Sequence, residues 1–132
     1  MGMNNQCTIT GQLYKSVINT SVAVNATASM IVGTTLSTGA LDAGTYKLGW
    51  FYAFSMSTAI DDFQAQIKVG STVVASFNIE ESDSTTLETQ CGFYYLTEST
   101  GGTSYTITLN FAAEAGTATL QAGSGLEFWR VA

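Results

Sequence analysis

From Leu36 to Val131 the chain is a succession of short segments in which the character of the side chains alternates with a period near two. In Tyr105–Phe111 the odd positions are apolar and the even positions are polar. This alternation is typical of a β-strand with one face toward a core and the other toward water. Clusters of Gly, Ser and Asp, which favour turns, separate the segments. The pattern therefore predicts an all-β fold.

The segments recur at intervals of about 8 to 12 residues, which is typical of an antiparallel sandwich of two sheets. Gly70-Ser71 lies between two apolar runs and predicts a two-residue hairpin with Gly at its first position. Helical spacing is absent, except for a possible turn at 111–115. We expect strands near 34–38, 45–55, 63–69, 72–79, 90–97, 104–111, 117–122 and 126–131.

Residues 1–33 have a different texture from the remainder of the chain. They carry one charged residue, Lys15, and the alternation of their side chains is loose. Such a segment is compatible with an extended arm or with an outer pair of strands. We expect an extended N-terminal arm over residues 1–33 and a β-domain over residues 34–132.

The charge of the chain excludes several kinds of partner. Its 132 residues carry a net charge of −6, and the four basic residues are scattered along the sequence. Binding to nucleic acid or to an anionic membrane requires clustered Lys and Arg, so we expect neither partner. Charged residues make up 11% of the chain, against about a quarter in ordinary soluble domains. We infer that other subunits cover part of the surface.

Few residues could carry out catalysis. The chain has no histidine, and its carboxylates lie mostly in expected loops. Asp61-Asp62 and the Glu80-Glu81/Asp83 cluster are candidate cation sites, but solvated loop charge is the favoured interpretation. Cys7 and Cys91 are expected to be free, buried residues. We therefore expect no enzyme activity, no catalytic residue, no metal site and no cofactor.

Three of the expected strands are apolar on both faces. They occupy residues 46–54, 91–96 and 126–131. The second apolar face of such a strand must be covered, and in a two-layer sandwich the cover is usually another subunit. Burial of one aromatic side chain removes about 150 to 250 Å² from water, which favours association. The alternative is that these residues cap a loop or strand end within one chain. The candidate subunit-interface residues are Phe51, Tyr94, Trp129 and Val131.

Several of these segments resemble those of a known family. Gly44–Trp50 resembles the strand that opens the core of TNF/C1q-like jelly rolls, and Cys91-Gly-Phe93 and Gly102–Leu109 follow in the same order. The ending, Ala118–Ala122 followed by Leu126–Val131, resembles that of small virion proteins of tailed phages, including head decoration (cement) proteins. The resemblance covers residues 34–132. It implies a two-sheet antiparallel jelly roll.

The resemblance also implies a function. It implies a homotrimer that binds the shell of the major capsid protein on the outer surface of the virion and stabilises the head. The N-terminal arm would then contact the shell or a neighbouring subunit. The candidate capsid-contact residues are Cys7, Ile9, Leu13, Tyr14, Val22 and Val24. The alternative is a phage fibre or spike tip that binds host-surface glycan through loops 55–62 and 80–90.

Overall fold

The computed structural model describes residues 13–26, 28–58, 61–80 and 86–132, and these residues form strands and loops without a helix. The strands are β1 (Leu13–Val17), β2 (Val22–Asn25), β3 (Ile31–Ala40), β4 (Gly44–Met56), β5 (Asp62–Val69), β6 (Thr72–Glu80), β7 (Glu88–Glu98), β8 (Ser104–Ala113), β9 (Thr117–Leu120) and β10 (Gly125–Arg130). The predicted all-β class is therefore confirmed.

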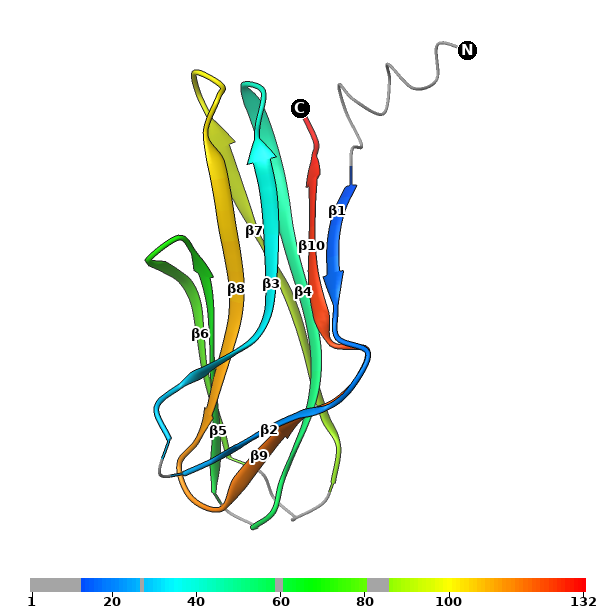
Figure 1. Ribbon diagram of the computed structural model, residues 1–132, viewed down its shortest axis with the longest axis vertical. Coiled ribbons are helices and arrows are strands. Elements are labelled where there is room, and N and C mark those ends of the chain that lie inside the picture. Colours follow the sequence, from blue (N-terminus) through cyan, green and yellow to red (C-terminus); the bar gives the residue numbers. More distant parts are fainter. Residues whose placement is uncertain (1–12, 27, 59–60, 81–85) are drawn as a thin grey trace.

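The strands form two antiparallel sheets that pack face to face (Figure 1). The six-stranded sheet has the order β1-β10-β4-β9-β2, and β7 pairs with the other edge of β4. The four-stranded sheet has the order β3-β8-β5-β6. Strands distant in sequence lie side by side in both sheets, as β1 and β10 do. This is the antiparallel two-sheet sandwich that the strand spacing predicts, with the jelly-roll arrangement that the family resemblance implies.

Strand β4 is central to the six-stranded sheet. Its 13 residues pair with β7 along one edge, from Gly44 to Phe54. On the other edge they pair first with β10 and then with β9. Its even-numbered side chains, from Tyr46 to Met56, point toward the other sheet and are all buried. The alternation in the sequence thus sets the orientation of the whole strand.

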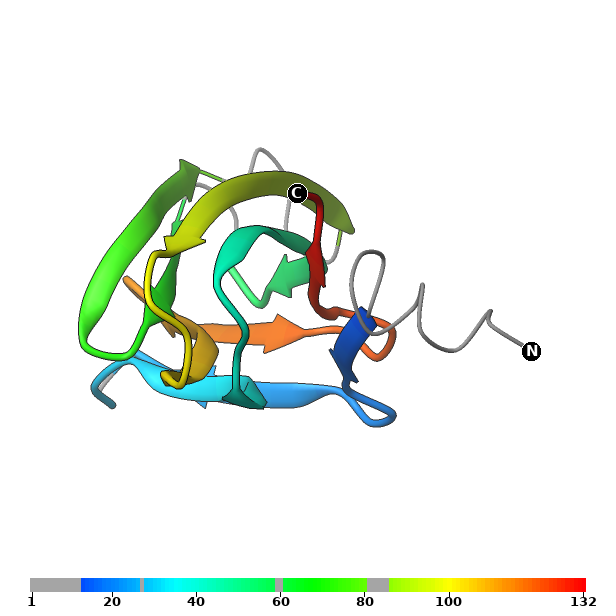
Figure 2. The same cartoon turned by 90° about the horizontal axis from the view of Figure 1, so that it is seen from above.

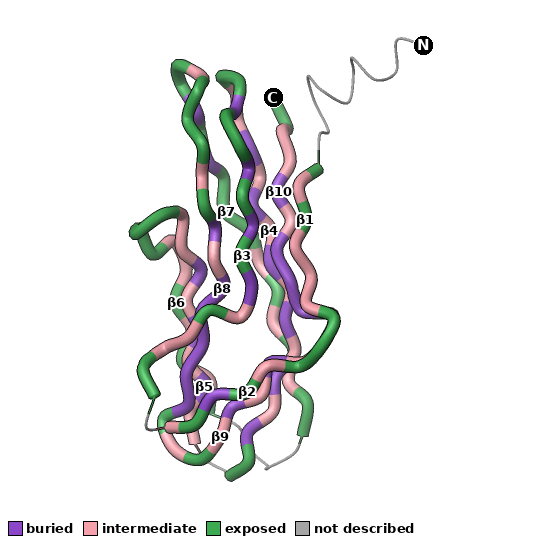
Figure 3. The backbone as a smooth tube through the Cα atoms, in the orientation of Figure 1, coloured by how far each residue is buried: buried purple, intermediate pink, exposed green. Residues whose placement is uncertain are grey.

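The core between the sheets is rich in aromatic side chains. The rings of Phe54 and Phe63 stack with their centroids 3.9 Å apart, which joins β4 to β5. Phe63 also stacks on Phe111 of β8 at 5.9 Å. Buried positions alternate with less buried ones along β4 and β10 (Figure 3). The packing of these rings therefore fixes how the two sheets lie against each other.

The strand boundaries agree with those expected from residue 34 onward, and the strands are a few residues longer at most ends. The predicted hairpin is confirmed, because Val69 pairs with Thr72 and Gly70 has a φ of 60°. A positive φ at this position favours glycine, which has no Cβ to clash. The possible turn at 111–115 is not helical, since β8 continues to Ala113.

Residues 13–25, expected within an extended arm, form an outer pair of strands instead. β1 pairs with β10, and β2 pairs with β9. They join the sheet because Val24 is buried and because Tyr14 and Val22 pack against the core. The expected boundary at residue 33 falls inside β3, which begins at Ile31. The earlier part of the expected arm lies outside the described residues.

On one side of the sandwich, β6 of the four-stranded sheet lies next to β7 of the six-stranded sheet. Seen from above, these strands (green and olive) are neighbours on the same side of the molecule (Figure 2). A cavity of about 490 Å³ opens between them, and Val74, Tyr94 and Tyr105 contribute to its lining. Tyr94 is 39% exposed at this opening.

A buried carboxylate, Glu98, holds the end of β7 against β8. Its residue is only 5% exposed, and the hydroxyl of Tyr105 donates a hydrogen bond of 2.8 Å to its Oε1 atom. This bond and those from Thr103 hold the pKa of Glu98 below its usual range. The same bond raises the pKa of Tyr105. Glu98 is therefore part of the structure's own hydrogen-bond network.

We expect Phe63→Ala to destabilise the fold by about 3 to 5 kcal/mol, because the change leaves a cavity between stacked rings. Chemical denaturation followed by circular dichroism measures this loss. The control is Val32→Ala, which truncates a half-exposed side chain of the same sheet. It should change the free energy of unfolding by less than about 1 kcal/mol. Equal effects of the two variants would contradict the described core.

We expect Tyr105→Phe to raise the pKa of Glu98 toward its ordinary value, because the largest stabilising hydrogen bond is lost. A lowered pKa stabilises the fold above the ordinary carboxyl pKa, and this contribution disappears as the pH falls through the folded-state pKa. The variant should therefore lose stability at neutral pH and approach the wild type in acid. NMR titration of Glu98 checks the shift. Tyr94→Phe is the control and should leave this pKa unchanged.

Candidate functional site

The outer face of the six-stranded sheet carries an unusual set of side chains. They come from strand positions whose neighbours point inward to the core, so they point away from it. In one row across the sheet, Trp129 of β10 pairs with both Leu13 of β1 and Lys47 of β4, and Lys47 pairs with Tyr95 of β7. We call this surface the aromatic face and define it by Leu13, Lys47, Phe51, Phe93, Tyr95 and Trp129.

Much of the aromatic face is exposed to solvent. Leu13, Phe93 and Tyr95 are 55%, 56% and 54% exposed. The rings of Phe93 and Tyr95 contact each other edge to face, with centroids 5.4 Å apart. Large apolar side chains gathered in this way are uncommon on the surface of a monomer and mark interaction sites.

A shallow depression of about 310 Å³ lies within the aromatic face. Gly49 contributes to its floor, because the position has no side chain and lies between Glu127 and Phe93 in neighbouring strands. Trp129 and Phe51 line its sides. The surface therefore has relief into which a side chain of another molecule could fit.

The side chain of Lys47 lies among the rings of this surface. Its Nζ atom is 4.4 Å from the centroid of the Phe93 ring. It is 5.9 Å from the centroid of Tyr95 and 5.6 Å from that of Trp129. Each distance is within the range of a cation–π interaction. The other lysine of this face, Lys15, forms an ion pair with Glu127 instead, at 3.6 Å.

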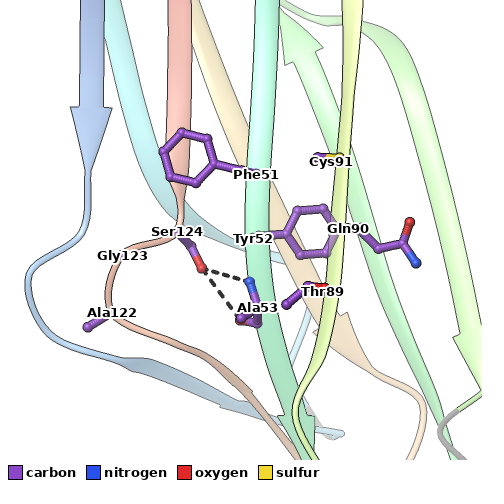
Figure 4. A pocket seen from close by; sticks show the side chains of 9 residues that line it. All are labelled: Phe51, Tyr52, Ala53, Thr89, Gln90, Cys91, Ala122, Gly123 and Ser124. Carbon is purple, nitrogen blue, oxygen red and sulfur yellow. Dashed lines mark hydrogen bonds between the residues drawn. The ribbon is translucent and has the colours of Figure 1, made fainter.

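A second pocket, of about 330 Å³, adjoins the aromatic face at Phe51 (Figure 4). The loop between β9 and β10 forms one of its sides. The hydroxyl of Ser124 in this loop accepts a hydrogen bond from the backbone N–H of Ala53 at 3.0 Å, which ties the loop to β4. Figure 4 shows Cys91 on β7 at the opposite side.

Cys91 was expected to be buried, and this expectation is wrong. The residue is free and exposed, because it shares the outward phase of Phe93 and Tyr95 in β7. Cys7 lies outside the described residues.

The four candidate interface residues do not all lie on one surface. Phe51 and Trp129 belong to the aromatic face, and Val131 is 40% exposed just beyond β10. Tyr94 points to the opposite side of the sheet, since it pairs with the fully buried Leu48. The structure thus separates Tyr94 from Phe51 and Trp129, with which it was predicted to form one interface, and places Phe93 and Tyr95 beside them instead.

Phe93 and Tyr95 are absent from the predicted interface residues, although the sequence holds a signal for them. Gly92 packs under the indole of Trp50, and a Cβ atom there would lie 2.6 Å from that ring. A glycine in a strand often marks such a close approach. Taking Gly92 as inward-facing would have placed Phe93 and Tyr95 outward.

The candidate capsid-contact residues are also divided by the structure. Leu13 is exposed on the aromatic face, whereas Tyr14 and Val22 pack against the core. Val24 is buried, so its side chain cannot reach another molecule in this conformation. Cys7 and Ile9 lie outside the described residues.

The candidate cation loops lie partly outside the described residues. Among the residues that the structure does describe, no group of three or more Cys, Asp or Glu side chains is placed to hold a metal ion. The Oδ2 atom of Asp62 accepts a hydrogen bond of 2.6 Å from Asn78, so this carboxylate has a partner within the sheet. The described part of the chain also contains no helix that could span a membrane.

Comparison with models of protein families and with curated proteins finds no match. Comparison with solved structures finds similar folds. The VP2 subviral particle of infectious bursal disease virus matches with a TM-score of 0.56 and 13% identity, over 89% of this chain and 32% of the other. This chain thus spans about a third of the VP2 chain.

Two further structures match over nearly their full length. Eiger TNF from S. frugiperda has a TM-score of 0.51 and 12% identity, over 91% of this chain and 92% of the other. The PRD1 vertex protein P5 has a TM-score of 0.52 and 9% identity, over 91% and 95%. At such low identities these likenesses establish the fold alone. The chain has the TNF-like jelly-roll fold.

Proposed function

We propose that this protein is a structural component of a virion, a homotrimeric decoration protein that binds the outside of the assembled capsid shell. The aromatic face is the observation that carries this proposal, because it provides a surface for self-association. The fold supports it as well, since similar folds occur in the VP2 subviral particle of infectious bursal disease virus, in the PRD1 vertex protein P5 and in Eiger TNF.

The aromatic face is well suited to a subunit interface. Phe93 and Tyr95 each keep about half of their surface in water. Covering this exposed half removes roughly 100 Å² of each side chain from water, which is worth about 2.5 kcal/mol at about 25 cal/mol per Å². Phe51 and Trp129 lie on the same surface and extend the contact. Side chains of this kind dominate the energetics of protein interfaces.

The low charge of the chain is consistent with this assembly. Of the four basic residues, Lys15 and Lys47 lie on the six-stranded sheet's outer face, and both are already engaged there with Glu127 and with the aromatic rings. Lys15 and Glu127 thus enter the proposed interface as a pair, and Lys47 is the one charge of this surface that has no ionic partner among the described residues. Val131, which directly follows the end of β10, adds apolar surface to the proposed contact.

We expect the purified protein to be a trimer at micromolar concentration, as measured by size-exclusion chromatography with light scattering. Trp129→Ala should dissociate it or weaken its association at least tenfold, because the indole is lost from the aromatic face. Val32→Ala, on the other sheet, is the control and should remain trimeric. A monomeric wild type would contradict the proposed assembly.

Attachment to the shell is assigned to residues before β1, including the candidate contacts Cys7 and Ile9. We expect deletion of residues 1–12 to leave the trimer intact, because this change spares every described strand. The truncated protein should no longer bind assembled shells of the major capsid protein encoded by the same genome. Co-sedimentation with shells, and with unassembled capsid subunits as the control, measures this loss. Normal attachment of the truncated protein would exclude the segment.

The glycan-binding alternative stays a prediction. It rests on loops 55–62 and 80–90, which include residues outside the described part of the chain. No contact or cavity of the described residues favours this alternative over self-association.

A further inference from the structure

The environment of Lys47 places a condition on whatever covers the aromatic face. Its ammonium group has three N–H donors and lies within 6 Å of three ring centroids. The rings attract the positive charge, but Lys47 donates no hydrogen bond to an oxygen of the described residues, the hydroxyl of Tyr95 included. Among the described residues Lys47 forms no ion pair, and the one carboxylate of this face, Glu127, is paired with Lys15. In the isolated chain, water can serve the ammonium.

Covering the face changes this balance. If a second subunit excluded water from the rings, an ammonium group without an acceptor would be left in an apolar interface, at a high cost in free energy. The cost falls when the covering surface brings an oxygen acceptor, and a carboxylate is the strongest one available. The chain itself has carboxylates in excess, with ten acidic and four basic residues. A second copy therefore meets the requirement.

We propose that Lys47, held among Phe93, Tyr95 and Trp129, is the docking point for a carboxylate of the neighbouring subunit. This inference rests on the proposed self-association and adds a specific role for one residue within it. The three rings fix the position of the charge, and the charge makes the contact selective for an acidic surface. Lys47 thus determines which part of a second copy can cover the face.

Replacement of Lys47 by Met tests this proposal, because the direction in which trimer association changes depends on whether Lys47 has a carboxylate partner. Met keeps a long apolar side chain and removes the charge. If Lys47 pairs with a carboxylate, Lys47→Met leaves that carboxylate facing apolar rings and weakens trimer association at least tenfold. If Lys47 is covered without an acceptor, the same change leaves association unaltered or tightens it, and that result would overturn the proposal.

Lys68→Met is the matched control, because Lys68 lies on β5 in the four-stranded sheet, away from the aromatic face. This change removes the same charge without altering the proposed interface. This variant should associate as the wild type does. Sedimentation equilibrium across a range of protein concentrations measures all three association constants. A monomeric wild type would count against the proposed function itself, whereas a trimeric wild type with unaffected Lys47→Met would reject only the role of Lys47.

A chemical cross-link decides the question if Lys47→Met does not fold. A carbodiimide joins an amine to a carboxylate with which it is in direct contact, and it acts on the unmodified protein. We expect an amide bond between Lys47 and an Asp or Glu of another copy, identified by mass spectrometry of trimers assembled from ¹⁴N- and ¹⁵N-labelled chains. A cross-linked trimer in which Lys47 remains unmodified would overturn the proposal.

Discussion

The pairing of β4 along both of its edges is the constraint on which the remaining structure depends. This strand joins β7 on one side to β10 and β9 on the other, so it holds the six-stranded sheet together. Because it is paired on both sides, its side chains can be in only one phase. The even-numbered side chains, including Trp50, Tyr52 and Phe54, therefore lie in the core. The odd-numbered side chains, including Lys47 and Phe51, lie on the outer face.

Much of the fold follows from local sequence patterns. The alternation in Tyr105–Phe111 and the Gly70-Ser71 turn predict β8 and the β5–β6 hairpin, because burial has a period of two over the first part of β8 and over most of β5. The local pattern does not predict the strands in residues 13–25. Their short strands have few inward-facing side chains, and their partners β9 and β10 lie about a hundred residues away. Such pairing depends on the assembled sheet, which local patterns do not encode.

The site was harder to predict than the fold for a related reason. In Phe93-Tyr94-Tyr95 all three residues are aromatic, so hydrophobicity does not reveal the phase of the strand. The phase is set by register, which pairs Leu48 with Tyr94 and Gly49 with Phe93. Phe51 and Trp129 were assigned to the outer surface correctly, because both lie out of phase with neighbouring core residues in their own strands. The alternation thus identified the outward-facing residues on β4 and β10. It did not identify them on β7, where apolar side chains occupy both faces.

The pairing of β1 with β10 has a further consequence. Leu13 lies opposite Trp129, so the chain enters the sheet beside the aromatic face, near the end of the sandwich where the last described residue, Ala132, also lies (Figure 1). In a cyclic assembly built on that face, the Leu13 ends of all subunits would therefore lie at the same end of the assembly. Contacts made from that end would be multivalent. Individually weak attachments could then give a strong overall hold, since each one made raises the effective concentration of the others.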